Sequence, residues 1–178
     1  MSDLYDQIVN QRGSFENLLA RIPGFRGYID KAARRTADRM IRDYVAGLLT
    51  QSVNRLAQLE RRLLENDGGL LYMSKTSSVK TKLQTYRDRV QTAAPGYSGF
   101  MEAIKVEADE LERLYSFDEA QVRYADRFEA ALDEFETAIS SKEGIDEAIA
   151  KLDALTIEAN EAFSLRENVL TDLDRKSL

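Results

Sequence analysis

The sequence predicts an all-α protein: an elongated antiparallel bundle of four to six long helices. Three observations predict this class. Apolar residues recur at spacings of three and four along most of the 178-residue chain, which is the period of an amphipathic helix. No segment alternates apolar and polar residues as a half-buried strand would. Both prolines fall between the helical segments, and the connections are short enough to favour antiparallel neighbours.

The first two expected helices cover residues 2–21 and about 30–65. The first ends at Pro23 and Gly24, because proline cannot continue a helix. Asp30 is a suitable N-cap for the second helix, which should stop at the glycines of the Asn-Asp-Gly-Gly sequence 66–69. A straight helix of about 36 residues is roughly 54 Å long, so the molecule should be elongated.

The remaining helices are expected at residues 71 or 74 to 93, 100–141 and 145–173. Ser77 and Ser78 resemble a helix start, and Ser116 with Glu119 reads as a capping box that would divide the fourth segment into two helices. We expect a single domain over residues 1–178. An internal duplication is the alternative, with repeats at 1–69 and 70–143 followed by a C-terminal helix at 144–175.

Two breaks between helices share the pattern Pro-Gly-aromatic-x-Gly-aromatic. Proline ends a helix, and glycine permits the backbone to turn sharply. We expect rigid corners in which the aromatic rings pack onto the bundle; a duplicated docking or hinge element is the alternative. The candidate structural corners are Pro23, Gly24, Phe25, Gly27 and Tyr28, and Pro95, Gly96, Tyr97, Gly99 and Phe100.

The residue inventory argues against most catalytic chemistry. The chain has no cysteine and no histidine, which removes disulfides, thiolate metal sites, cysteine nucleophiles and the usual general base near neutral pH. Carboxylate clusters at 107–110, 133–136 and 146–147 lack the ligand spacing of a calcium-binding loop, and we expect solvated acidic faces there. The sequence therefore predicts a protein that is not an enzyme and needs no metal or cofactor.

Charge is divided between the two parts of the chain. Residues 1–100 carry 16 Lys and Arg against 10 Asp and Glu, whereas residues 101–178 carry 9 against 21. The net charges are therefore +6 and −12. This division can act within the fold, between copies of the chain, or toward another molecule.

A basic stripe on the second expected helix is the candidate interaction surface. Long cationic side chains in such a stripe suit an acidic protein surface or anionic lipid headgroups. In the alternative interpretation, Asp38 and Asp43 neutralise the stripe through pairs four residues apart. The residues of this surface are Lys31, Arg34, Arg35, Arg39 and Arg42.

These observations favour a non-catalytic scaffold or adaptor that acts through another protein or through self-association. The alternative is a peripheral membrane protein that uses the amphipathic segment 2–21 and the basic stripe. A third hypothesis is an unusual enzyme or carrier with a cavity between helices that holds an apolar ligand beside the aromatic corners. Nucleic acid is a disfavoured partner, since the isoelectric point is about 4.9 and no reading motif is present. The N-terminus lacks the features of a secretory signal, so we expect a cytoplasmic protein.

Overall fold

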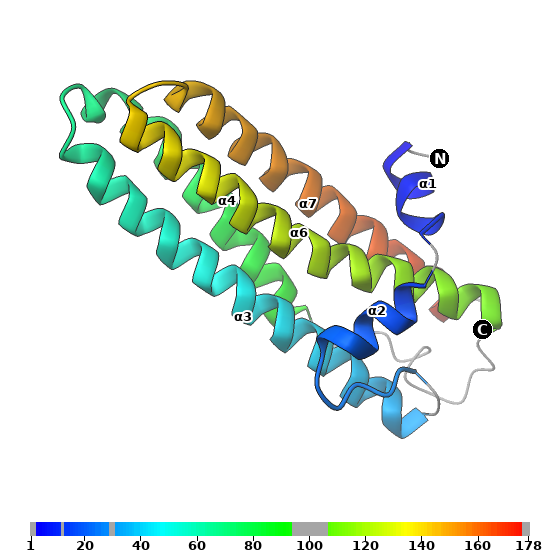
Figure 1. Cartoon of the computed structure of the whole chain (residues 1–178). Helices are drawn as coiled ribbons and strands as arrows, with labels where there is room; N and C mark the ends of the chain where they lie inside the picture. Colours follow the sequence, from blue (N-terminus) through cyan, green and yellow to red (C-terminus); the bar gives the residue numbers. More distant parts are fainter. Residues whose placement is uncertain (1–2, 12, 29–30, 94–106, 176–178) are drawn as a thin grey trace.

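The computed structural model describes residues 3–11, 13–28, 31–93 and 107–175. Every regular element in these ranges is helical (Figure 1), so the predicted all-α class is confirmed. The elements are α1 (Asp3–Val9), α2 (Ser14–Arg21), α3 (Lys31–Leu64), the 3-10 helix η1 (Gly69–Tyr72), α4 (Met73–Thr92), α6 (Ala108–Ser141) and α7 (Ile145–Arg175).

The four long helices form an antiparallel bundle. Helix α3 packs against α4 and α6, and α7 packs against the same two helices (Figure 1). Their apolar stripes meet inside this ring of neighbours, where Leu56, Leu83, Phe128, Phe135 and Leu152 are almost completely buried. The core is therefore shared by all four helices, as the three-and-four spacing of the apolar residues predicts.

Two short helices cover one end of the bundle. Helices α1 and α2 lie against α6, at the end of the bundle where α6 begins (Figure 1). The prediction of one helix over residues 2–21 is wrong, because α1 ends at Val9 and α2 begins at Ser14. Gly13 between them has a left-handed backbone with φ 75°, a conformation that interrupts a helix. Ile8 and Leu18 are both buried in the core.

Two further expected helix boundaries are also wrong. Helix α6 continues through Ser116, whose hydroxyl donates to the backbone oxygen of Glu112 at 2.9 Å within the helix. The capping box lies instead at Glu107 and Glu110, at the start of α6. Ser77 and its neighbour lie inside α4, which begins at Met73 directly after η1. These serines bond locally or face solvent, so their types alone could not mark a boundary.

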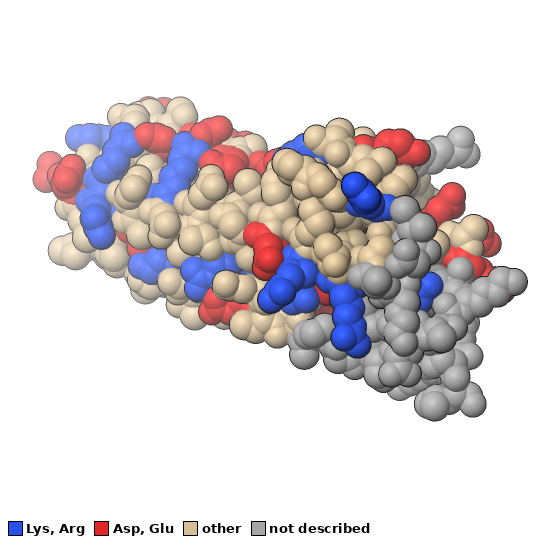
Figure 2. Space-filling view, turned by 90° about the horizontal axis from the view of Figure 1, so that it is seen from below, with Lys and Arg blue, Asp and Glu red and all other residues tan. Residues whose placement is uncertain are grey.

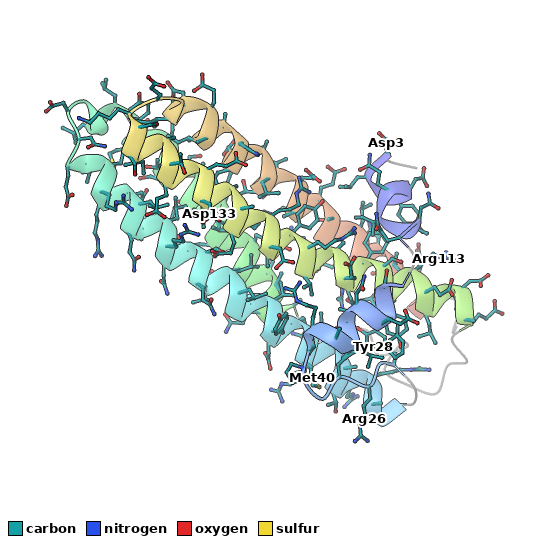
Figure 3. All side chains as sticks on the ribbon, in the orientation of Figure 1. Asp3, Arg26, Tyr28, Met40, Arg113 and Asp133 are labelled. Atoms are coloured by element: carbon teal, nitrogen blue, oxygen red, sulfur yellow. The ribbon has the colours of Figure 1, made fainter. Side chains whose placement is uncertain are left out.

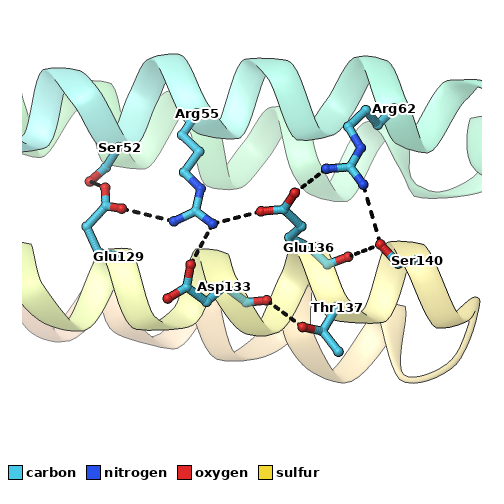
Figure 4. A network of polar contacts seen from close by, with 8 residues as sticks. All are labelled: Ser52, Arg55, Arg62, Glu129, Asp133, Glu136, Thr137 and Ser140. Atoms are coloured by element: carbon cyan, nitrogen blue, oxygen red, sulfur yellow. Dashed lines mark hydrogen bonds and ion pairs between the residues drawn. The ribbon is translucent and has the colours of Figure 1, made fainter.

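The charge division of the sequence is used largely within the fold. Arg55 of α3 pairs with three carboxylates of α6: Glu129 at 3.0 Å, Asp133 at 2.6 Å and Glu136 at 2.8 Å (Figure 4). Arg62, two turns further along α3, also pairs with Glu136. The basic N-terminal part of the chain thus binds the acidic C-terminal part along the length of the bundle. Other pairs of this kind are Arg21–Asp126, Lys75–Asp146, Lys82–Asp153 and Arg89–Glu167.

Among the described residues, none of the helices combines the length and the apolar composition needed to cross a bilayer.

Candidate functional site

The structure divides the basic stripe of α3 into inward and outward side chains. Arg34 is buried, with 8% of its surface exposed, and Arg42 is only partly accessible, whereas Arg35 and Arg39 are exposed. Positions 35, 39 and 42 are spaced by four and three residues and share one side of the helix, whereas position 34 lies on another. Lys31 begins α3, but its side chain lies outside the described part. The stripe is therefore not one continuous surface.

Arg42 is held in place by two helices. Its Nε donates to Oδ2 of Asp38 at 2.9 Å, and its Nη1 donates to the backbone oxygen of Ala93 at 2.8 Å. The second bond ties α3 to the chain immediately after α4. Because only 12% of the Arg42 side chain is exposed, the guanidinium is oriented before any ligand arrives.

Arg35 and Arg39 lie at the surface without a carboxylate partner among the described residues. Neither forms an ion pair with any residue that the structure describes, and the expected pair between Arg39 and Asp43 does not form. Together with Arg42 they line a cleft of about 500 Å³ whose other wall is residues 91–93 at the end of α4. Viewed from the α3 side, basic side chains gather beside the grey residues (Figure 2).

The cleft has the chemistry of an anion-binding surface. A guanidinium presents several N–H donors in a planar fork that matches a carboxylate or a phosphate. Three arginines line this cleft against one carboxylate, Asp43. The arrangement can therefore hold more than one negative group, with Arg42 as the donor fixed by its own hydrogen bonds and Arg35 and Arg39 as the exposed ones.

A buried polar network lies directly behind Arg42. Arg166 of α7, only 2% exposed, donates from Nε to Oδ1 of Asp118 at 2.6 Å and from Nη2 to Oδ1 of Asp38 at 2.8 Å. The hydroxyl of Tyr28 donates to Oδ2 of Asp118 at 2.6 Å. Since Asp38 also binds Arg42, the network connects the floor of the cleft to α6 and α7.

Burial and charge act against each other in this network. Burial raises the pKa of Asp118, while Arg166 and the Tyr28 hydroxyl oppose that rise. Burial also raises the pKa of Tyr28, helped by the charge of Asp118, so the phenol stays protonated and remains a donor. Desolvation alone would lower the pKa of Arg166, but Asp118 and Asp38 hold it well above the ordinary value. Arg166 is therefore a charged residue in the core.

This network was not predicted from the sequence, although the spacing of its residues contains a signal. Asp38 lies three residues before Ile41 of the α3 core stripe, and Arg166 lies four residues before Leu170 of the α7 stripe. Ionisable residues at core positions are rarely buried unless they are paired. Searching the apolar stripes for such residues would have identified both sides of the network.

The first aromatic corner is part of the core. Phe25 and Tyr28 are 4% and 1% exposed, and the ring of Tyr28 stacks on Tyr115 with 5.3 Å between centroids. The backbone N–H of Tyr28 donates to the Tyr115 hydroxyl at 2.8 Å. A Cβ at Gly27 would lie 2.6 Å from Phe15 and from Tyr115, so only glycine fits. Tyr28 thus lies between the α2 region and the bundle (Figure 3). The aromatic rings of Phe25, Tyr28 and Tyr115 fill this corner.

Other residues of the two corners have different places. Pro23 and Gly24 are exposed at the turn after α2, and Gly24 adopts a left-handed φ of 79°. The second corner, with Pro95, Gly96, Tyr97, Gly99 and Phe100, lies outside the described residues.

Carboxylates of the acidic clusters at 133–136 and 146–147 form ion pairs with basic residues of neighbouring helices. Asp133 and Glu136 are committed to Arg55, and Asp146 pairs with Lys75. Within the ranges that the structure describes, no group of three or more His, Cys, Asp or Glu side chains is placed to hold a metal ion.

Comparison of the chain with protein-family models, with curated proteins and with solved structures found no match. The basic cleft and the network behind it are therefore assessed on their geometry.

Proposed function

We propose that this chain is a cytoplasmic, non-catalytic helical adaptor that binds an acidic segment of another protein in the basic cleft of α3. One observation carries the proposal: Arg35 and Arg39 are exposed and form no ion pair with any described residue. By contrast, Arg55 and Arg89 are neutralised by carboxylates of neighbouring helices. The positive charges of Arg35 and Arg39 in the cleft are therefore not paired with a carboxylate of the described residues.

The size and layout of the cleft favour a segment of chain as the ligand. A cavity of about 500 Å³ accepts several side chains but not a folded domain. Arg35 and Arg39 are four residues apart, which corresponds to about 6 Å along the helix axis. Carboxylates at a similar spacing on an extended or helical segment would reach both guanidinium groups. The fixed Arg42 loses little side-chain freedom on binding, which reduces the entropic cost of association.

The membrane-binding alternative has less support in the fold. Its amphipathic segment is divided into α1 and α2, and both pieces bury their apolar residues, Ile8 and Leu18, in the core. An interfacial helix must instead present its apolar face to the lipid. Of the two features predicted to bind a membrane, the basic cleft is then the one that stays accessible, and a concave site fits a chain segment better than a flat surface.

Fluorescence anisotropy with a labelled deca-glutamate peptide tests the proposal. The double variant Arg35→Glu/Arg39→Glu should bind the peptide at least about tenfold more weakly, because two attractive charges become repulsive. Added salt should weaken binding to the wild-type protein, since exposed charges are screened. Arg61→Glu is the matched control: Arg61 is exposed at the other end of α3 and has no ion pair among the described residues.

Three outcomes would contradict the proposal. Wild-type protein that does not bind the peptide at low salt would remove the acidic-segment function. An equal loss with Arg61→Glu would show that net charge, not the cleft, controls binding. If the peptide fails to bind but phosphatidylserine vesicles bind in a manner that depends on Arg35 and Arg39, the membrane function replaces the proposed one. Circular dichroism should show that every variant is folded.

A further inference from the structure

Arg42 in the basic cleft keeps one nitrogen for a ligand. Its Nε donates to Oδ2 of Asp38, and its Nη1 donates to the backbone oxygens of Ala93 at 2.8 Å and Gln91 at 3.5 Å. Nη2 carries two further N–H groups and makes no hydrogen bond to any described residue. It is also not one of the unpaired polar atoms that the protein encloses. Since Arg42 lines the cleft, Nη2 is the donor that an acidic ligand would meet there.

Asp38 is shared between two arginines. Its Oδ2 accepts from Nε of Arg42 at 2.9 Å, and its Oδ1 accepts from Nη2 of Arg166 at 2.8 Å. Both oxygens of this carboxylate are therefore engaged, each by a different guanidinium. The Asp38 side chain is only 7% exposed, so water has little access to it. Asp38 thus holds Arg42 through a single oxygen.

Arg166 prevents a tighter pairing of Asp38 with Arg42. A carboxylate and a guanidinium commonly pair through two parallel hydrogen bonds, and on this edge of Arg42 the two donors would be Nε and Nη2. That pairing needs Oδ1 of Asp38, which Arg166 occupies. Asp38 lies four residues before Arg42 on one face of α3, so a rotation of its carboxylate brings Oδ1 toward Nη2 once Arg166 is absent. With Arg166 in place, Nη2 stays free.

Arg166 reaches Asp38 from the far side of the bundle. Helices α3 and α7 lie diagonally opposite each other, with α4 and α6 between them (Figure 1). Arg166 therefore crosses the core, and Asp118 of α6 anchors it on the way, since Oδ1 of Asp118 accepts from its Nε at 2.6 Å. A planar guanidinium meets both carboxylates with two donors of one edge, which a lysine ammonium does not provide.

We propose that Arg166 is a positioning residue for the basic cleft: by holding Oδ1 of Asp38, it keeps Nη2 of Arg42 available to an acidic ligand. Arg166 itself, with 3% of its side chain exposed, does not touch the ligand. This inference rests on the proposed function, because the ligand is the acidic segment that the cleft binds. It adds that the affinity of the cleft is determined in part from α7. Without Arg166, Asp38 pairs with Arg42 through both oxygens and takes the donor from the ligand.

Anisotropy with the labelled deca-glutamate peptide tests this inference in a charge-neutral variant. Asp118→Asn/Arg166→Met removes one negative and one positive charge and leaves every residue that lines the cleft in place. We expect about tenfold weaker peptide binding at low salt, the typical contribution of one hydrogen bond to a charged group. Glu60→Gln/Lys80→Met is the matched control. It neutralises another pair with a buried carboxylate, between α3 and α4, about 27 Å along α3 from the cleft, and it should bind the peptide like wild type.

A double-mutant cycle separates positioning from a general effect on the core. In the Arg42→Gln background, the donor that Arg166 preserves is absent, so Asp118→Asn/Arg166→Met should cause no further loss of affinity. A change in core packing or in the long-range field of the buried charges would instead weaken binding in both backgrounds.

A third substitution should rescue the charge-neutral variant. The amide of Asp38→Asn has one acceptor oxygen and cannot complete the fork with Arg42. Added to Asp118→Asn/Arg166→Met, it should return the affinity to within about threefold of wild type. In the wild-type background, where Arg166 still occupies Oδ1, Asp38→Asn should raise the affinity by a smaller factor than it does in the charge-neutral variant.

A measurement on the wild-type protein does not depend on any variant being folded. In nitrogen NMR spectra of the arginine side chains, the peptide should shift the Nη resonance of Arg42, whereas the Nε–H signal, which is bonded to Asp38, should stay unchanged. An Nη resonance of Arg42 that the peptide does not shift would overturn the inference.

The outcomes distinguish this inference from the proposed function. If the wild-type protein binds the peptide through Arg35 and Arg39 but Asp118→Asn/Arg166→Met binds it equally well, the positioning role is overturned and the proposed function stands. An equal loss in the Glu60→Gln/Lys80→Met control, a further loss in the Arg42→Gln background, or no rescue by Asp38→Asn would also overturn the positioning role. Wild-type protein that does not bind the peptide would remove both. Circular dichroism should show that each variant is folded.

Discussion

Replacing Arg166 by methionine tests whether the buried network is a pair of desolvated charges. The substitution keeps a long apolar side chain but removes the cation that binds both Asp118 and Asp38. Asp38 retains Arg42 as a partner. Asp118, which is 0% exposed, retains only the Tyr28 hydroxyl among its hydrogen-bond donors in the described structure. The cost of the substitution should therefore arise mainly at Asp118.

The size of that cost follows from the pKa of Asp118. Burial already raises this pKa and Arg166 opposes the rise, so Arg166→Met should raise it further. If Asp118 becomes fully protonated in the folded variant, neutralising it costs about 1.36 kcal/mol for each pH unit above the unfolded pKa of about 3.9. The upper limit is then about 4 kcal/mol at pH 7 and about 1.5 kcal/mol at pH 5, similar at pH 7 to the loss of other buried ion-pair partners.

The sign of the pH dependence distinguishes this cause from simple loss of packing. A carboxyl whose pKa is higher in the folded than in the unfolded state contributes stability at low pH, and this contribution is lost as the pH rises through the folded pKa. Relative to wild type, Arg166→Met should therefore be most destabilised near neutral pH and less so at pH 5. A packing defect would have the same effect at both values.

Urea unfolding followed by circular dichroism at pH 7 and pH 5 measures both quantities. The double variant Asp118→Asn/Arg166→Met removes the carboxylate as well, so the extra loss of stability that Arg166→Met shows at pH 7 over pH 5 should be absent from it. Two results would refute the reasoning: a loss of stability below about 1 kcal/mol for Arg166→Met at pH 7, or a loss that does not fall at pH 5. Removing one partner of a buried ion pair normally destabilises a protein by several kcal/mol, because the other charge stays buried and unpaired.

Three further substitutions probe the rest of the fold. Gly69→Ala should lower the free energy of unfolding by about 1–3 kcal/mol, because its Cβ would meet Leu63 and the turn must move; no change in urea midpoint would contradict the packed turn. Phe135→Ala, at a fully buried site, should cost about 3–5 kcal/mol in the same assay, and a cost under half of that would show that the core collapses into the space. Lys151→Ala should change stability by less than about 1 kcal/mol, since its pair with Glu134 is more than half exposed on both sides; a larger effect at high salt would contradict a screened surface pair.

The long helices could be predicted from the sequence because their signal is local. The spacing of Ile41, Val45 and Leu56 places them on one face of α3, and the structure buries all three. Breaks were harder to predict. Gly13 divides the first segment because its backbone is left-handed. The neighbouring residue types do not indicate that the backbone takes this conformation at Gly13. Ser116 has the type and spacing of a cap but lies inside α6.

The candidate surface could be predicted only in part. The positions of Arg35 and Arg39 on one side of a helix follow from the sequence, but the burial of Arg34 depends on which side of α3 faces its neighbours. Two leucines after α3 illustrate the same point. Position 71 is one of the two expected starts of the third helix, and the spacing does not show that Leu70 and Leu71 are directed to solvent after the closely packed turn at Gly69.

The sequence by itself determined that this chain forms long amphipathic helices joined by short turns, and that its two parts carry opposite charge. Periodicity and composition are properties of neighbouring residues, so no tertiary information is needed to read them. Only the tertiary structure decided how those charges are used. Arg55 meets Glu129 across 74 residues of sequence, and Arg166 meets Asp38 across 128. Such pairs depend on which helices are neighbours and on their rotation, and the burial of all four apolar stripes in one core determines both.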